Sequence, residues 1–394
     1  MRFPPSRPQP EQHSHENIRN QKPGHEIVTT IAQSYLEPQV LKTVCSILAE
    51  DDQVRADAPC YLSTVASWAD KIRFHARWSA PLHFINGNGD HPPTDCRFPG
   101  PDGWDGKERA NVLDAVNNVS TILTNFAQGS SAAGAPELAQ EALKFLIHFV
   151  GDMHQPLHLC GRDRGGNSDK VHWDNRVTSA CAFWTSILVQ RFLTAVVYCV
   201  KKTDLHSVWD NSLIAKAIRL TPNNYTRPVP LPALESSFRG AIYDPYIRRI
   251  VWEGMGSGNI AGRWESESGS WNSCPASSVS ESAVDAEWAP PQEVLAAPRK
   301  PKPGPGRGPP ETSDSDILCP YAWGAPIHKL NCEIVWPAEL DEPETEGRAP
   351  RRDYLELDTP KYAGSIEKKW IVEKLLAQAG VRLAGILNRI FSQQ

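Results

Sequence analysis

The stretch from Glu137 to His158, which reads ELAQEALKFLIHFVGDMHQPLH, places the strongest constraint on the fold of this chain. Its apolar residues recur at helical spacing on nearly every face, which predicts a buried helix. His148 and Asp152 are four residues apart and therefore share one face of that helix. Burying an ionised carboxylate costs on the order of several kcal/mol unless a cation or a hydrogen-bond partner compensates. The pattern therefore predicts that Asp152 meets a positive charge inside the protein.

Two interpretations of this pair differ in what supplies that charge. A lone His/Asp pair is more often a hydrogen-bonded core histidine beside a capping aspartate. Here the Gln155–Pro156 step ends the helix, and His158 follows within reach of the same point. Three candidate ligands in so short a stretch favour a metal site over a core histidine.

Periodicity and breaker residues predict the secondary structure of the rest of the chain. Helices are predicted at about 23–36, 39–49, 60–74, 108–126, 231–254 and 364–391, with an extended segment at 81–86 and a short strand at 170–173.

Further candidate ligands lie elsewhere in the chain, and LHSVWD at 205–210 repeats the His-x-x-x-Asp spacing. The candidate set has five imidazoles, three carboxylates and no thiolate: His25, Asp70, His83, His148, Asp152, His158, His206 and Asp210. Such donors suit catalytic zinc, and they exceed one tetrahedral site. Two ions about 3.5 to 4 Å apart that share a carboxylate would hold a hydroxide for in-line attack on phosphorus.

The composition narrows the class of protein. Of the 394 residues, 40% are hydrophobic and 22% are charged, which predicts a soluble protein with one sizeable core. A net charge of -5 argues against a general basic surface that binds a polyanion by counterion release. If nucleic acid is the substrate, metals must supply the local positive charge. The sequence contains no Gly-rich phosphate loop, nucleophile elbow or internal repeat.

The cysteines and the first residues give different indications of the compartment. Nine cysteines without a CxxC pattern favour disulfides over thiolate ligands. Acceptor sequons at Asn118 and Asn224 also suit a secreted protein. Residues 1–22 hold no apolar run, so no signal peptide is predicted in the chain as written. We therefore expect either an internal protein or a true N-terminus that is missing.

Three segments are predicted to lie outside the folded domain. Residues 1–22 are expected to form an unstructured extension of a domain at 23–392. The apolar run at 179–200 holds Gln190–Arg191 at its middle, which disfavours a membrane span, and an apolar insertion is expected at 178–202. Residues 275–316 lose all periodicity and include a proline-rich tract, so a disordered loop is expected there.

Six motifs together resemble the trinuclear-zinc, single-strand-specific nucleases of the S-one and P-one type. They are His25-Glu26 with IAQSYL, Trp68-Ala69-Asp70, Leu82-His83-Phe84-Ile85, HFVGDMHQPLH, GGN at 165–167, and LHSVWD. The resemblance covers about 24–175, 203–260 and 319–392, and HxxGDxHQPLH with a downstream LHxVWD is highly specific. Bacterial zinc phospholipases C resemble this fold more distantly. The resemblance implies an all-α fold with a single helical domain and its metals in one cleft.

The resemblance also implies a role for each matching residue. Its first zinc site corresponds to Asp70, His83, His148 and Asp152, and its second to His158, His206 and Asp210. Asp152 would bridge to a third zinc held by His25. The family's third ion is also bound by an N-terminal tryptophan before the Gly-His, and this chain has residues 20–23, Asn-Gln-Lys-Pro, at that place.

The substrate residues follow from the same motifs. Asp70 would also orient the nucleophilic water, and Arg73 would neutralise the phosphate. Phe84 would stack a splayed base, while Asn167 matches a base-pocket position and Asn86 stands where the family usually has an aspartate. Taken alone, Phe84 would more often be a core aromatic and Arg73 a solvated side chain.

The function implied is a secreted, zinc-dependent endonuclease that cleaves single-stranded DNA and RNA to products with 5'-phosphates, with 3'-nucleotidase action as a further activity. A monomer without a stable protein partner or a membrane is expected. The resemblance aligns Cys96 and Cys332 with bridged segments and so implies a disulfide between them, and a second disulfide, Cys274–Cys319, is expected to close off the proline-rich tract as a loop. Two alternatives stay open: a lipid hydrolase of the zinc phospholipase C type, and an inactive product of a faulty gene model.

Overall fold

A computed structural model describes residues 23–49, 60–100, 102–106, 109–130, 136–174, 202–227, 235, 243–256, 261–275, 314–341 and 354–392. In these residues the protein is helical apart from one two-stranded sheet, which confirms the predicted all-α class. The predicted extension at 1–22, nearly all of the predicted insertion at 178–202 and most of the tract at 275–316 lie outside the described residues. The domain limits of 23–392 therefore stay a prediction.

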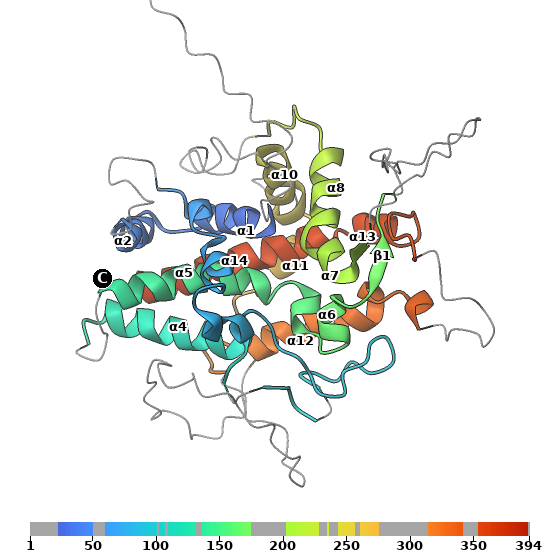
Figure 1. Cartoon of the computed structure of the whole chain (residues 1–394). Coiled ribbons are helices and arrows are strands. Elements are labelled where there is room, and N and C mark those ends of the chain that lie inside the picture. The colour runs from blue at the N-terminus through green and yellow to red at the C-terminus, as the bar shows by residue number, and fades with distance from the viewer. Residues whose placement is uncertain are drawn as a thin grey trace, which may run out of the picture.

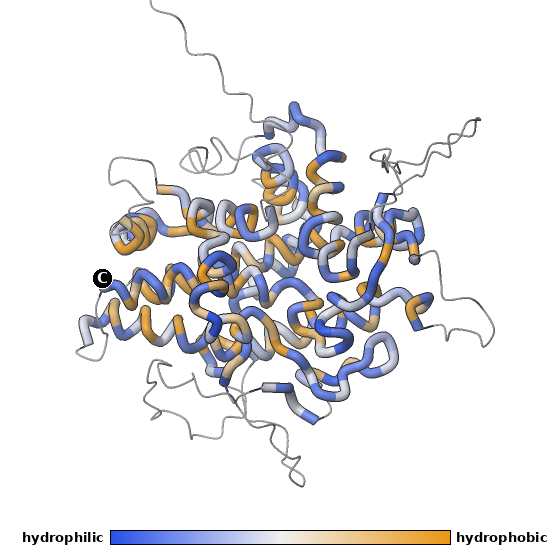
Figure 2. Tube along the Cα trace, in the orientation of Figure 1, coloured by the Kyte–Doolittle hydropathy of each residue, from blue (hydrophilic) through white to orange (hydrophobic). Residues whose placement is uncertain are grey.

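Four long helices form the centre of the fold: α1 (Pro23–Ser34), α4 (Val112–Ala127), α5 (Pro136–Asp152) and α14 (Ile371–Phe391). In Figure 1, α4 and α5 lie side by side, and α14 runs between them and α1. The orange, apolar segments of Figure 2 recur along these helices, where their buried residues meet. As predicted, α5 is buried, and it ends at Asp152 before a 3-10 turn at Pro156–Leu159.

Shorter elements surround this centre. The helices are α2 (Pro38–Leu48), α3 (Trp68–Ile72), α6 (Asp163–Gly166), α7 (Leu205–Ser207), α8 (Leu213–Leu220), α10 (Asp244–Arg249), α11 (Glu265–Ser268), α12 (Pro320–Leu330) and α13 (Ala363–Lys369). Further 3-10 turns span Leu62–Thr64, Arg77–His83 and Ala338–Leu340, and π-helical turns span Val208–Ser212, Ile250–Met255 and Asn331–Val335. No helix in the part of the chain that the structure describes is long and apolar enough to cross a membrane.

Two predicted helices are interrupted. The one expected at 60–74 consists of a 3-10 turn and α3. The one expected at 364–391 breaks at Trp370, whose backbone is left-handed with φ 56° and ψ 40°. The guanidinium groups of Arg249 and Arg263 lie 4.5 and 5.0 Å from the centroid of the Trp370 indole ring. These cation–π contacts offset the cost of about 1 kcal/mol that a left-handed residue imposes.

The sheet pairs β1 (Lys170–His172) with β2 (Lys202–Asp204) in antiparallel register, with His172 opposite Lys202. The strand expected near 170–173 is therefore present. Because opposite residues of such a pair lie about 4.5 to 5.5 Å apart, the chain leaves and re-enters the fold at nearly one point on either side of residues 173–201.

The described cysteines form three disulfides. Cys96–Cys332 and Cys274–Cys319 confirm the pairs expected from the family, and Cys45–Cys60 was not foreseen. Cys160 is a free, buried thiol.

Candidate metal centre

All eight predicted ligands lie in the described residues and converge on one place, although they come from separate elements. His25 lies in the first turn of α1, Asp70 lies in α3, and His83 ends a 3-10 turn. His148 and Asp152 lie on α5, and His158 follows in the next 3-10 turn. His206 in α7 and Asp210 in the π-helical turn complete the set. The fold thus brings together residues up to 185 positions apart in the sequence.

Asp152 is the centre of this set. Its Oδ2 lies 2.9 Å from His83 Nδ1 and 3.3 Å from His148 Nε2. Its Oδ1 lies 3.4 Å from both His25 Nε2 and His158 Nδ1. Only 2% of this side chain is exposed. Each oxygen therefore lies within 3.4 Å of two imidazole nitrogens.

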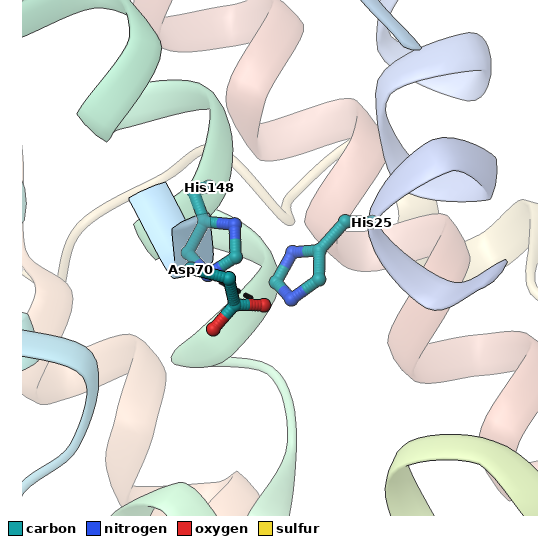
Figure 3. Close-up of side chains that lie close together, drawn as sticks. All are labelled: His25, Asp70 and His148. Carbon is teal, nitrogen blue, oxygen red and sulfur yellow. Dashed lines mark ion pairs between the residues drawn. The ribbon is translucent and has the colours of Figure 1, made fainter. Parts of the chain in front are cut away.

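The candidate ligands fall into three groups whose donor atoms lie within 4.8 Å of one another: His83–His148–Asp152, His25–Asp70–His148 and His158–His206–Asp210. Figure 3 shows the second group, with the His25 ring projecting from α1 toward His148 and Asp70. His148 belongs to two groups, so the assignment of each ligand to a particular ion stays a prediction.

Backbone carbonyls orient three of the histidines. His148 Nδ1 donates to Ala66 O at 2.7 Å, His158 Nδ1 to His83 O at 2.7 Å, and His206 Nδ1 to Gly165 O at 2.8 Å. Because a carbonyl oxygen only accepts, each Nδ1 carries the proton, and each Nε2 offers its lone pair to the cluster. This is the outer-shell pattern of a metal-binding histidine.

The electrostatics of the centre favour bound cations. Burial opposes the ionised form of Asp152, but His148 and His158 outweigh it and hold the pKa of its carboxyl well below the usual range. Burial likewise opposes the charged form of His158, yet Asp152 and Asp210 raise its pKa to about 9. His83 Nε2 is buried without a hydrogen-bond partner. A metal ion fits this set of nitrogen and oxygen donors and would satisfy that nitrogen.

His154, in the same motif, is a core histidine and not a ligand. Its Nδ1 donates to Val150 O at 2.7 Å, and its Nε2 accepts from Arg382 Nη1 at 2.8 Å. Burial and the Arg382 guanidinium lower the pKa of His154 well below its usual value. Both ring nitrogens are used, so none is left for a metal.

A further group, Asp90–Cys96–His328, has donor atoms at similar spacing. Cys96 is bonded to Cys332, so it offers no thiolate. Asp90 Oδ2 lies 3.0 Å from His328 Nε2 and accepts from Gly161 N at 3.1 Å. This buried pair ties the loop after Asn86 to α12.

Two positioning residues were not foreseen from the sequence. Gln155 Nε2 donates to Asp210 Oδ1 at 2.8 Å and so orients that ligand. Residues 163–166 all have positive φ, and a methyl group on Gly165 would lie 2.4 Å from Leu157 O. The close contact with Leu157 O means that only glycine fits at position 165 of this left-handed turn, which aims the Gly165 carbonyl at His206. Gln155 belongs to the HQPLH motif and Gly165 to the GGN motif. The motifs drew attention to these residues but did not predict which hydrogen bonds they make.

Asp169, just after this turn, gives a test of the local electrostatics. Burial and then Asp163 raise the pKa of its carboxyl from 3.8 to about 6, and its Oδ2 is buried without a hydrogen-bond partner. The folded state therefore binds the proton more tightly than the unfolded state, and stability falls as the pH rises from about 4 through 6. We expect Asp169→Asn to raise the melting temperature at pH 8 and to leave it unchanged near pH 4, as measured by thermal unfolding. An equal shift at both pH values would contradict this.

The predicted substrate residues lie beside the metal ligands in sequence. Ile85 N donates to His158 O at 2.8 Å, so the segment that carries Phe84 is tied to a ligand segment. Phe84 is 38% exposed, and Arg73 Nη1 lies 3.5 Å from Asp70 Oδ1. Asn86 is half-buried, whereas Asn167 is exposed and donates from Nδ2 to Arg164 O. Their roles in binding stay predictions.

A cavity of about 70 Å³ adjoins the centre. Its polar wall is formed by His25, Asp152, His158 and Asp210, and its apolar wall includes Val28, Trp209, Ile214 and Leu375. Such a volume accommodates a few water molecules beside the ligands.

Comparison with known proteins agrees with this geometry. Residues 21–237, more than half of the chain, match the family described as S1/P1 Nuclease. The chain is 28% identical to Endonuclease 4 of Arabidopsis thaliana over 381 residues, which cover 95% of this chain and 89% of that protein. It is 36% identical to Endonuclease 2 of the same plant over 43% of this chain and 56% of that protein. It is 33% identical to Nuclease P1 of Penicillium citrinum over 43% of this chain and 58% of that protein. The chain therefore belongs to the S1/P1 nuclease family.

Proposed function

We propose that this protein is a zinc-dependent nuclease that hydrolyses phosphodiester bonds of single-stranded DNA and RNA, leaves 5'-phosphates and also removes 3'-phosphates from nucleotides. The observation that carries the proposal is Asp152, which is buried among four imidazoles within 3.4 Å of its two oxygens. Zinc fits the all-nitrogen-and-oxygen donor set. Bound there, zinc would stabilise negative charge on the phosphate and lower the pKa of water toward neutrality.

The protein's own groups act on the water and on the phosphate. Asp70 has 12% of its side chain exposed and so meets solvent at the edge of the centre, where its carboxylate can orient an attacking water. Arg73 is held beside it, and its side chain is 39% exposed. Since guanidinium groups match phosphate oxygens in a planar fork, Arg73 is placed to neutralise the scissile phosphate. Cleavage then breaks the bond between phosphorus and the 3'-oxygen, which takes up a proton.

Selectivity for single strands is assigned to Phe84. Its backbone is extended, with φ -154° and ψ 169°, and its ring is partly exposed directly after the ligand His83. A base can stack on such a ring only when it is not paired within a duplex. Phe84, with Asn167, supports a nucleotide substrate over the lipid headgroup of a phospholipase C. The three disulfides support secretion into an oxidising compartment.

Removal of zinc tests the metal mechanism. Excess chelator is expected to abolish hydrolysis of single-stranded DNA, and added zinc to restore it, because the residues at the centre cannot by themselves neutralise a developing phosphorane. The same treatment should lower the melting temperature, since metal binding stabilises the folded state. Full activity in excess chelator would refute the proposal.

Phe84→Ala tests the base platform. Stacking of a base on an aromatic ring contributes about 1 to 3 kcal/mol, so we expect KM for single-stranded oligonucleotides to rise roughly 5- to 100-fold. Phe84→Tyr keeps the ring and should restore the parental KM. Parallel assays with a phosphocholine lipid separate the two enzyme classes, because lipid hydrolysis that exceeds nucleic-acid hydrolysis would favour the phospholipase alternative.

A further inference from the structure

The ring of His25 lies flat against α5. It stacks on the ring of His148, with 3.9 Å between the ring centroids and 14° between the planes. From this position His25 Nε2 reaches to 3.4 Å from Asp152 Oδ1 (Figure 3 shows His25 beside His148). Because His25 belongs to α1, its ring can reach Asp152 only if α1 and α5 approach closely at this point.

Gly151 provides the space for that approach. A methyl group built on Gly151 would lie 2.5 Å from His25 Nδ1 and 2.9 Å from His25 Cε1. Both distances are shorter than non-bonded carbon contacts allow. Gly151 is the next-to-last residue of α5 and is not among the glycines with positive φ, so its backbone does not require glycine and alanine would normally be the more favourable residue. The glycine is therefore explained by space for the histidine ring and not by the backbone of the helix.

The ring cannot accommodate a methyl group by a small shift. The ring also stacks on His148, which is fully buried and is held by its hydrogen bond to Ala66 O. Only 12% of the His25 side chain is exposed. A methyl group at position 151 would therefore push His25 away from Asp152, while the group His158–His206–Asp210 lies on other elements and would keep its geometry.

We propose that Gly151 is a positioning residue for the metal ion held by His25, and that it determines whether this ion binds at all. The inference rests on the proposed function, in that the centre binds zinc. Replacing Gly151 by alanine then converts the enzyme to a form with one fewer zinc ion and an otherwise intact fold.

A double-mutant cycle tests this. The parent, Gly151→Ala, His25→Ala and the double variant are equilibrated with buffered zinc, and zinc per chain and melting temperature are measured. Each single variant should lose about one zinc per chain, and the double variant should lose no more than either. Gly151→Ala should lower the melting temperature of the parent but raise that of His25→Ala, because the methyl group then meets no ring and only the helical preference for alanine remains.

A matched control is Gly364→Ala. A methyl group there meets nothing nearer than 3.7 Å, so zinc content should not change. If Gly151→Ala fails to fold, the double variant still tests the inference. It lacks the His25 ring, so the clash is relieved and folding should be restored. A Gly151→Ala protein with the parental zinc content would overturn this inference and leave the proposed function standing. So would a double variant that loses as much zinc as the two single variants together. A parent that binds no zinc would overturn the proposed function together with it.

Discussion

Asp152→Asn is expected to lower hydrolysis of single-stranded DNA by at least about a thousand-fold, since it removes several kcal/mol of metal-dependent stabilisation. The amide keeps the shape of the side chain but has no negative charge for His25, His83, His148 and His158, which surround it. Those four imidazoles would then lack the anion that links them. Zinc per chain, measured by mass spectrometry of the dialysed protein, should fall in parallel with activity.

Asp90→Asn is the matched control. Asp90 is also buried and also pairs with a histidine, His328, but it lies outside the three ligand groups around Asp152. Its loss should reduce stability, because His328 is left without its partner, yet the folded variant should keep its zinc and its activity. If Asp152→Asn and Asp90→Asn behaved alike, Asp152 would be a structural residue and the shared-ligand interpretation would be wrong.

Replacing residues 175–201 by Asn-Gly is expected to leave zinc content and activity at or above the parental level and to increase soluble yield. The physical reason is the pairing of His172 with Lys202, which already brings the two ends of this segment together. With Trp173 and Asp174 kept, Asn-Gly completes a four-residue hairpin connection of a common kind. Shortening the connection about sevenfold should also stabilise the fold by roughly 2 kcal/mol through a smaller loop-closure entropy.

The comparison requires both forms to be produced in the same way, behind the same signal peptide. Zinc per chain, melting temperature, soluble yield and the rate on single-stranded DNA are then measured. His206 and Asp210 follow β2 directly, so any distortion of the hairpin would appear as lost zinc. A shortened chain with less zinc or slower cleavage than the parent would show that the segment belongs to the catalytic fold.

The candidate metal ligands could be picked out from the sequence, and the structure brings them together, whereas the groups that orient them could not be foreseen. His148 and Asp152 stand out because helical spacing places polar groups on an otherwise apolar helix. The backbone carbonyls of Ala66 and Gly165 accept hydrogen bonds from two of the histidines. Residue type does not reveal such acceptors, because every residue has a backbone carbonyl. Likewise, the break at Trp370 arises from tertiary contacts with Arg249 and Arg263, which override local helical preference.

The disulfides were likewise predicted only in part. Cys96–Cys332 was expected because the resemblance aligns these two cysteines with bridged segments, and Cys274–Cys319 was expected as the bridge that closes off the proline-rich tract. Cys45–Cys60 was missed, since counting cysteines gives no connectivity. The base-binding roles of Phe84, Asn86 and Asn167 were expected from the resemblance alone, because exposure does not distinguish a stacking ring from an ordinary surface residue.

The central position of α14 has a consequence for how the protein is made. Gly380 of α14 lies so close to Ile31 of α1 that a methyl group would meet its side chain at 2.5 Å, and Asn388 donates to Tyr35 O. The helix that carries His25, α1, therefore cannot complete its packing until residue 391, at the end of α14, has been synthesised. At a synthesis rate of about 5 to 20 residues per second, roughly 20 to 70 s pass on the ribosome between the synthesis of α1 and that of α14. A transcript truncated before Ile371 would leave α1 with its apolar face uncovered, so such a product should be degraded before any metal is bound.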